Sequence, residues 1–167
     1  MIATRPCFHV GVRFALTLAL VATVVAPACR TAPRTPMPAG SSATTAVIET
    51  GAGAVTFRVE VADTEAEREV GLMGRTALDA DAGMVFLFDG TTTASFWMKD
   101  TLIPLSIAFI DKKGKIVRIA EMKPFDESRT SSLYPARYAL EMNKGWFAQR
   151  GIKAGAKLRG LERFAPR

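Results

Sequence analysis

Residues 107–119, IAFIDKKGKIVRI, carry the clearest structural signal in the sequence. An uninterrupted apolar run at 107–110 leads into the polar segment 111–114, which ends in glycine, and a second apolar-rich run follows at 116–119. Two such runs joined by a short turn predict a β-hairpin. Since the first run has no polar residue, we expect its strand to be buried on both faces.

Similar signals lie on both sides of this hairpin. In residues 54–61, apolar side chains alternate with polar ones, which is typical of a strand with one buried face. Gly51 and Gly53 predict a turn that pairs this strand with residues 47–48. Another continuous apolar run occupies residues 84–88. Further strands are predicted at residues 95–99, 137–142 and 157–161.

Helix signals are few. Thr64 and Glu67 have the spacing of a capping box, which predicts one short helix that ends near Gly74. Residues 144–150 allow a turn or two at most. Many short strands separated by turn residues predict that residues 47–167 form a mostly β domain, a single compact antiparallel β-sandwich or barrel with one short helix.

The composition limits the chemistry of this domain. The chain has 167 residues and a net charge of +6, and its single His and two Cys are His9, Cys7 and Cys29. The domain therefore lacks the residues of a Ser–His relay, a thiol nucleophile and the usual zinc sites, and we expect no metal and no cofactor. The basic residues are spread among 16 acidic ones, with no run longer than Lys112-Lys113. This spacing predicts no nucleic-acid partner.

The N-terminus predicts export. Residues 1–13 contain two Arg and no acid, residues 14–26 form an uncharged apolar run, and Ala26 and Ala28 provide small residues before a cleavage site. This pattern is typical of a signal peptide over residues 1–28. The apolar run is shorter than a membrane-spanning helix requires, and no transmembrane helix is expected in the mature chain.

Cleavage after Ala28 would leave Cys29 at the new N-terminus. The site resembles a bacterial lipobox, although Ala26 and Pro27 are unusual in one. Lipidation of Cys29 would anchor the protein to a membrane and would remove a free thiol from an oxidising compartment. A soluble periplasmic protein is the alternative. Residues 29–46 are rich in Pro and small polar residues and are predicted to be a disordered tether.

Residues 96–111, FWMKDTLIPLSIAFID, together with Gly114, resemble the signature of the bacterial and archaeal domain of unknown function family 192. Supporting segments follow the family in order, and the resemblance covers roughly residues 54–161. It implies a compact, mostly antiparallel β-sandwich or barrel of jelly-roll character, often behind a signal peptide or lipobox, and it implies no activity. Asp100 stands where the family usually has Asn. Ser106 stands where Asp is frequent, so a role of a carboxylate at position 106 does not carry over.

The same motif contains the candidate ligand-binding residues. In a strand, Phe96, Met98 and Asp100 would share one face, and Trp97 and Lys99 the other. Phe96 and Met98 are therefore expected in the core. Trp97 either packs over the sheet or, with Lys99 and Asp100, forms the rim of a pocket that suits a sugar or another flat ligand.

Asp100 and Glu141 are the candidate catalytic residues, because two carboxyl groups at a suitable distance can act as acid and base in glycoside hydrolysis. The alternative for Asp100 is to accept backbone hydrogen bonds in its turn. Arg75 and Arg137 are candidates for binding an anionic ligand. Each could instead pair with Asp100 or Glu141 as a structural strut.

These features favour a non-enzymatic, extracytoplasmic module that binds an unknown small molecule, envelope component or partner protein. It would meet a membrane only through a lipid anchor on Cys29. A carboxylate-dependent hydrolase of an envelope glycan is the second interpretation, disfavoured by the missing His and Cys, and a structural envelope accessory is the third. The long polar loop at residues 123–133 is predicted to be mobile or to close over a pocket near Trp97.

Overall fold

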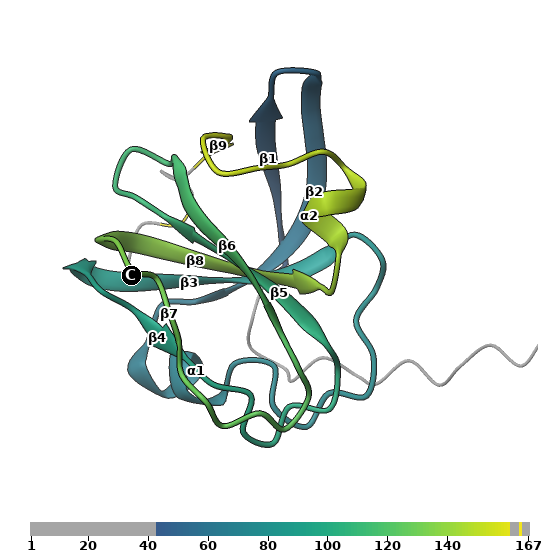
Figure 1. Ribbon diagram of the computed structural model, residues 1–167, viewed down its shortest axis with the longest axis vertical. Coiled ribbons are helices and arrows are strands. Elements are labelled where there is room, and N and C mark those ends of the chain that lie inside the picture. Colours follow the sequence, from purple (N-terminus) through teal and green to yellow (C-terminus); the bar gives the residue numbers. More distant parts are fainter. Residues whose placement is uncertain (1–42, 161–163, 165–167) are drawn as a thin grey trace, which may run out of the picture. The chain divides into compact units, whose positions relative to one another are not determined.

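Strands dominate residues 43–160, which, with Phe164, are the part of the chain that the computed structural model describes (Figure 1). Each strand except β7, which lies in the polar segment predicted to be a loop at residues 123–133, coincides with, or lies within a few residues of, an apolar or alternating segment of the sequence. The elements in chain order are β1 (Thr44–Thr50), β2 (Gly53–Ala62), α1 (Glu65–Val70), β3 (Ala82–Thr92), β4 (Ser95–Phe96), β5 (Leu105–Ile110), β6 (Ile116–Met122), β7 (Thr130–Ser131), β8 (Ala136–Asn143), α2 (Trp146–Gln149) and β9 (Lys157–Arg159).

Seven of these strands form one sheet in the order β6-β5-β8-β3-β2-β1-β9, and β4 and β7 form a separate two-stranded sheet. The large sheet curls as a half-barrel, so that its edge strands β6 and β9 meet at one end (Figure 1). There Lys115 and Lys157 form a β-bridge, and the N–H of Ile116 donates to the carbonyl of Ala156 at 2.9 Å. The predicted mostly β fold is confirmed, whereas a sandwich or jelly roll is not.

Both predicted hairpins are present. β5 pairs antiparallel with β6 across the turn at residues 111–114, and β1 pairs antiparallel with β2 across the turn at residues 51–52. β5 is buried along its whole length, as expected of a strand without charged residues. The prediction of a purely antiparallel architecture is wrong at one place, because β2 and β3 are parallel.

The parallel pair requires a crossover connection, which residues 63–81 provide. Its first part is α1, which begins where the capping box predicted: the hydroxyl of Thr64 accepts from the N–H of Glu67, and the Glu67 carboxylate accepts from the N–H of Thr64. A second short helix, α2, forms where the sequence allowed a turn or two. The connection matters for function because it lies over one face of the sheet.

Both faces of the large sheet are covered, and they hold separate apolar clusters. Because side chains alternate along each strand, neighbouring residues such as Val85 and Phe86 belong to opposite clusters. One cluster is closed by Trp146 and Phe147 of α2. The other is closed by the crossover and by the segment after β4, and its members include Leu72, Phe86, Phe96, Met98, Ile107 and Phe109. Phe96 and Met98 therefore pack in the core, as predicted.

The start of the described chain bears on the predicted N-terminal segments. β1 begins at Thr44, so the last residues assigned to the tether form part of the sheet. The predicted signal peptide, Cys29 and the rest of the tether lie outside the described residues. Neither of the two helices among the described residues is long and apolar enough to cross a membrane.

Candidate functional site

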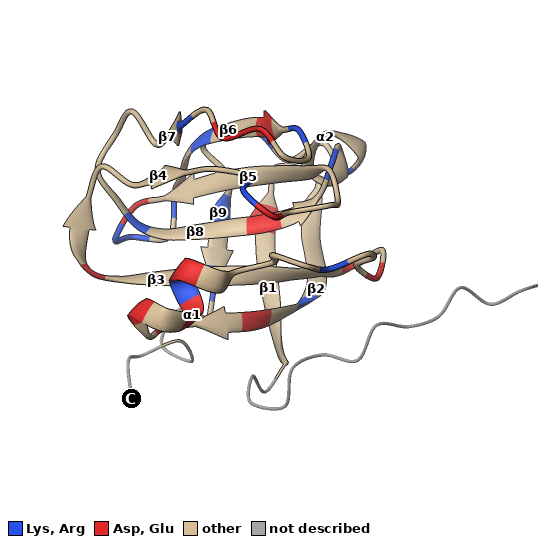
Figure 2. Cartoon of the chain, turned by 90° about the horizontal axis from the view of Figure 1, so that it is seen from below, with Lys and Arg blue, Asp and Glu red and all other residues tan. Residues whose placement is uncertain are grey.

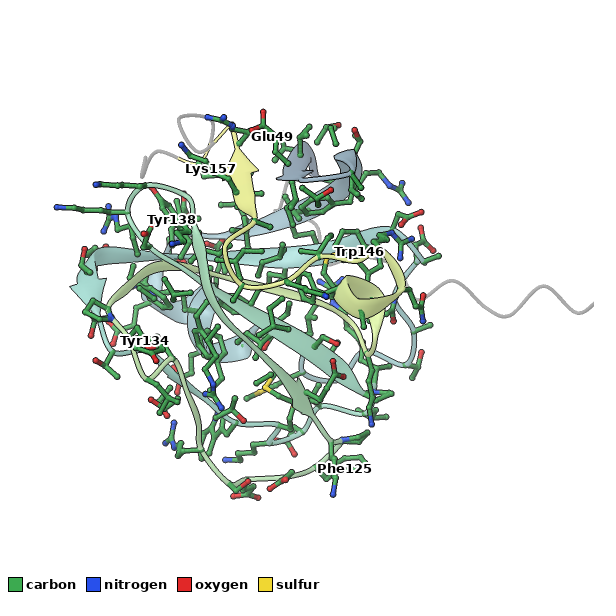
Figure 3. The ribbon with its side chains drawn as sticks, turned by 45° about the horizontal axis from the view of Figure 1, so that its top comes forward. Glu49, Phe125, Tyr134, Tyr138, Trp146 and Lys157 are labelled. Atoms are coloured by element: carbon green, nitrogen blue, oxygen red, sulfur yellow. The ribbon has the colours of Figure 1, made fainter. Side chains whose placement is uncertain are left out.

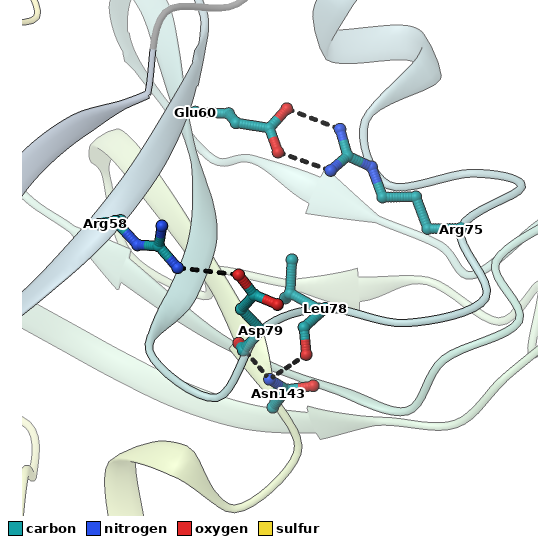
Figure 4. A network of polar contacts seen from close by, with 6 residues as sticks. All are labelled: Arg58, Glu60, Arg75, Leu78, Asp79 and Asn143. Carbon is teal, nitrogen blue, oxygen red and sulfur yellow. Dashed lines mark hydrogen bonds and ion pairs between the residues drawn. The ribbon is translucent and has the colours of Figure 1, made fainter. Parts of the chain in front are cut away.

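The crossover holds an ion pair against the sheet. Arg75 binds Glu60 of β2 through two parallel contacts, Nη1 to Oε1 at 2.5 Å and Nη2 to Oε2 at 2.6 Å (Figure 4). Both side chains are almost inaccessible, with 11% of Arg75 and 6% of Glu60 exposed. Arg75 is thus a structural strut, but its partner is Glu60 and not Asp100 or Glu141. A bidentate, shielded pair of this kind fixes the crossover rather than offering a cation to a ligand.

Two further contacts hold the end of the crossover (Figure 4). The side-chain amide of Asn143 on β8 donates to the carbonyls of Leu78 and Asp79, at 3.3 and 3.0 Å. The Asp79 carboxylate also accepts from Arg58 at 2.8 Å, in a contact that is more than half exposed. Together with the Glu60–Arg75 pair, these contacts bind the crossover to two strands, β2 and β8.

Glu141 lies under this cover. Its neighbours across the sheet are Met84 on β3 and Ile107 on β5, and it is only 4% exposed. Burial among these apolar neighbours raises the pKa of Glu141 to about 8, because the charged form loses its water. Glu141 is therefore a neutral acid at neutral pH. Arg137, four residues earlier on the same face, has a buried Nη1 without a partner among the described residues.

Asp100 is placed quite differently. It is exposed, it has a left-handed backbone with φ of 51°, and its carbonyl accepts from the N–H of Gly74 at 2.8 Å. The left-handed region favours Gly, Asn and Asp, which explains why a short polar residue occupies this turn. Asp100 is exposed and Glu141 is buried, and neither lines any of three hollows that lie in the described residues.

A hollow of about 460 Å³ lies beside Trp97 instead. We call it the Trp97 hollow. Its floor consists of Phe86, Phe88 and Phe96, whose rings meet edge to face with centroids 5.0 and 6.3 Å apart. The other lining residues come from α1, from the segment that runs from the end of β3 through β4 to Trp97, and from the loop before β7: Glu65, Arg68, Glu69, Thr92, Thr93, Ala94, Ser95, Trp97 and Arg129.

Trp97 holds two cations against its ring. The guanidinium carbon of Arg129 lies 4.4 Å and the Nζ of Lys99 lies 5.4 Å from the ring centroid. The predicted association of Trp97 with Lys99 is therefore present, although β4 ends at Phe96 and Lys99 does not line the hollow. Arg129 belongs to the loop at residues 123–133, so this loop does reach Trp97.

That loop is bound to its surroundings along its length. The N–H of Met98 donates to the carbonyl of Asp126 at 2.8 Å, and the N–H of Phe125 donates to the carbonyl of Thr101 at 3.2 Å. Its last residues form β7, which pairs with β4. The loop thus provides a fixed wall of the Trp97 hollow.

Charged groups of α1 form the opposite wall, beside β3 (Figure 2). Glu65, Arg68 and Glu69 share one side of the helix because residues three and four apart are neighbours. Arg68 donates to the carbonyls of Asp63 and Leu87, at 2.6 and 2.9 Å, so its role is to hold α1 against the sheet. The two carboxylates remain as acceptors at the rim, opposite Arg129.

Sequence reasoning found Trp97 but missed Arg68, Glu69, Phe88 and Arg129. The capping box located α1 and could have placed its carboxylates on one side, but nothing in the sequence indicated which strand they would face. Arg129 is close to Trp97 only because β7 pairs with β4.

Comparisons with known proteins agree on the family and the fold. The model of the family DUF192, described as Uncharacterized ACR, matches residues 45–160. A solved structure from Novosphingobium aromaticivorans DSM 12444, a protein of unknown function, is 36% identical with a TM-score of 0.71, and the match covers 78% of this chain and 94% of that one. A structure from Sinorhizobium meliloti 1021, provisionally described as a transcription regulator, is 33% identical with a TM-score of 0.70, covering 71% and 94%. None of the curated proteins matches the chain.

Proposed function

The chain belongs to domain of unknown function family 192, to which no activity is assigned, and we propose that the protein is an exported module that binds a small ligand in the Trp97 hollow. One observation carries the proposal: Trp97 and Arg129 stack at the edge of a hollow of about 460 Å³ with a floor of phenylalanine rings. Hollows of roughly 300–1,000 Å³ that combine an apolar floor with a few polar groups are typical of small-molecule sites.

The ligand that fits this chemistry is a sugar ring from an envelope glycan. Its apolar face would lie on the aromatic floor, while its hydroxyl groups would meet the carboxylates of Glu65 and Glu69 and the guanidinium of Arg129. Thr92, Thr93 and Ser95 add hydroxyl groups at the rim. Such a mixture of aromatic floor and acceptors suits an uncharged polar ring better than an anion.

We propose binding rather than catalysis. Glycoside hydrolysis uses two carboxyl groups roughly 5–10 Å apart that flank one bond. Asp100 is exposed in its turn, Glu141 is buried beneath the crossover, and neither lines the Trp97 hollow. The description of the Sinorhizobium protein as a transcription regulator is not extended to this chain, because the predicted signal peptide would remove the protein from the compartment that holds DNA.

The binding proposal predicts that Trp97→Ala weakens sugar binding about fivefold or more, since a buried aromatic contact is worth over about 1 kcal/mol. The native protein is screened by thermal shift against N-acetylglucosamine, its oligomers and common hexoses, and each responding sugar is then titrated by calorimetry. Phe125→Ala is the matched control, because Phe125 is an exposed aromatic residue of the loop at residues 123–133 and does not line the hollow. It should leave the affinity unchanged.

Two results would count against this assignment. If Trp97→Ala binds the sugar as well as the native protein does, the hollow is not the site. If no sugar of the panel shifts the melting temperature of the native protein, the interpretation as a structural envelope accessory is favoured.

Export and anchoring are a separate part of the proposal. We expect the mature protein extracted from membranes to begin at Cys29 and to carry the added mass of a lipid. Intact-mass spectrometry measures this directly, and Cys29→Ser is the control, which should move the protein into the soluble fraction. A mature chain that begins at an unmodified Cys29 would instead indicate a soluble periplasmic protein.

A further inference from the structure

A second hollow lies at the end where β6 and β9 join, between the tip of the β1–β2 hairpin and residues 151–157. Its volume is about 420 Å³. We call it the closure hollow. It shares no residue with the Trp97 hollow, and Figure 3 shows two of its side chains, Glu49 and Lys157, close together at this end of the sheet. We propose that the closure hollow binds a phosphate group.

The charge around the closure hollow is positive. Lys153 and Lys157 line it, and Glu49 is the acidic residue among its described lining residues. That carboxylate is already paired with Arg159 at 2.6 Å. Arg159 and Lys157 hold the pKa of Glu49 below its usual value, so it stays charged and stays bound to its neighbours. Lys153 is left to face an anion, while the charge of Lys157 acts on both Glu49 and the hollow.

The backbone around the closure hollow provides hydrogen-bond donors in addition to the lysine side chains. Gly151 and Gly155 have φ of 64° and 101°, which non-glycine residues rarely adopt, and they turn the chain around the hollow. Between them, the N–H groups of Lys153 and Ala154 have no acceptor among the described residues. Backbone N–H groups in a glycine-containing turn, close to lysine side chains, are a recurring way to bind phosphate.

The tertiary structure also enlarges the basic region. The β-bridge between Lys115 and Lys157 brings the turn that carries Lys112 and Lys113 next to β9. Lysines near an edge strand could merely prevent edge-to-edge association. That role needs charge alone, whereas phosphate binding also needs the open space of the hollow, and this difference can be tested.

The test titrates the full chain with inorganic phosphate and pyrophosphate at low ionic strength, followed by calorimetry and by the amide NMR shifts of residues 151–157. We expect Lys153→Gln combined with Lys157→Gln to weaken binding at least tenfold. The pair Lys112→Gln and Lys113→Gln changes the net charge by the same amount outside the hollow, and it should weaken binding less than about threefold, through long-range attraction alone.

A third variant tests whether binding needs the open space of the hollow, without changing the charge. Gly51 lines the hollow, its φ is outside the left-handed range, and a Cβ added there meets no atom within 4 Å. Gly51→Leu should therefore fold, fill part of the hollow and reduce binding at least tenfold without changing any charge. If Gly51→Leu binds phosphate like the native protein, or if the two lysine pairs weaken binding equally, the proposal is overturned.

Additional binding experiments identify the kind of molecule that carries the phosphate. Native protein that binds phosphatidylglycerol vesicles but not phosphatidylcholine vesicles, and loses this in Gly51→Leu, indicates a lipid headgroup. Binding of free phosphate without vesicle binding indicates a soluble phosphate compound. Binding of neither overturns the proposal, and so does binding of duplex DNA that both lysine pairs weaken equally.

Discussion

Arg75→Met is expected to lower the free energy of unfolding by about 3–5 kcal/mol, because it breaks a shielded, bidentate ion pair with the Glu60 carboxylate. Glu60 is 5% exposed, and both of its oxygens lie within 2.6 Å of the Arg75 guanidinium. The loss should be measured by urea unfolding at neutral pH. The crossover that Arg75 holds should also exchange its amide hydrogens faster in the variant.

Two further variants identify the cause of that loss. Arg58→Met removes a guanidinium from the same strand as Glu60, but its pair with Asp79 is 62% and 56% exposed, so the cost should be about 1 kcal/mol or less. Combining Arg75→Met with Glu60→Leu removes both buried charges and should recover much of the lost stability. If the double variant is less stable than Arg75→Met alone, the loss of the buried ion pair is not the cause.

Glu141→Gln is expected to become progressively more stable than the native protein as the pH rises from 4 to about 8. The pKa of Glu141 is about 8 in the folded protein and near 4.5 when the chain is unfolded. Below pH 4 the carboxyl group is protonated in both the folded and the unfolded state, so it does not affect the folding equilibrium. Between the two pKa values the unfolded chain releases the proton and the folded chain keeps it, so rising pH favours unfolding.

The expected size of this effect is about 3–5 kcal/mol between pH 4 and pH 8.5, since each unit of pKa difference corresponds to about 1.4 kcal/mol. The measurement is urea unfolding of both proteins across this range, with the difference in unfolding free energy plotted against pH. Glu127→Gln removes an exposed carboxylate and serves as the control, whose curve should follow that of the native protein. A constant difference between native protein and Glu141→Gln would show that Glu141 ionises normally.

Local sequence patterns predicted the elements well, for physical reasons that act over a few residues. The apolar run of β5 and the glycine-containing turn after it are sufficient to form a hairpin, and the capping box of Thr64 and Glu67 starts α1. Phe96 and Met98 were placed in the core by their alternation. Such features depend on neighbours along the chain, so the sequence displays them directly.

The same patterns failed where contacts join distant segments. In the sequence, Glu60 lies on the polar side of an alternating strand and would be expected to be exposed. It is buried because the crossover that connects β2 to the parallel strand β3 lies over that side and carries Arg75. In the sequence, Arg137 and Glu141 look like ordinary charged residues of a strand. The segments that cover β8 bury Nη1 of Arg137 and the side chain of Glu141.

The sequence by itself determined the mostly β character, the two hairpins, the short capped helix and the family, because turn residues and side-chain alternation act locally. The tertiary structure decided which charges come together. The turn that carries Lys112 and Lys113 comes next to β9 once β9 meets the start of β6. Arg129 reaches Trp97 only through the pairing of β7 with β4. Electrostatic and aromatic contacts depend on distance in space, and sequence separation does not determine that distance until the sheet has formed.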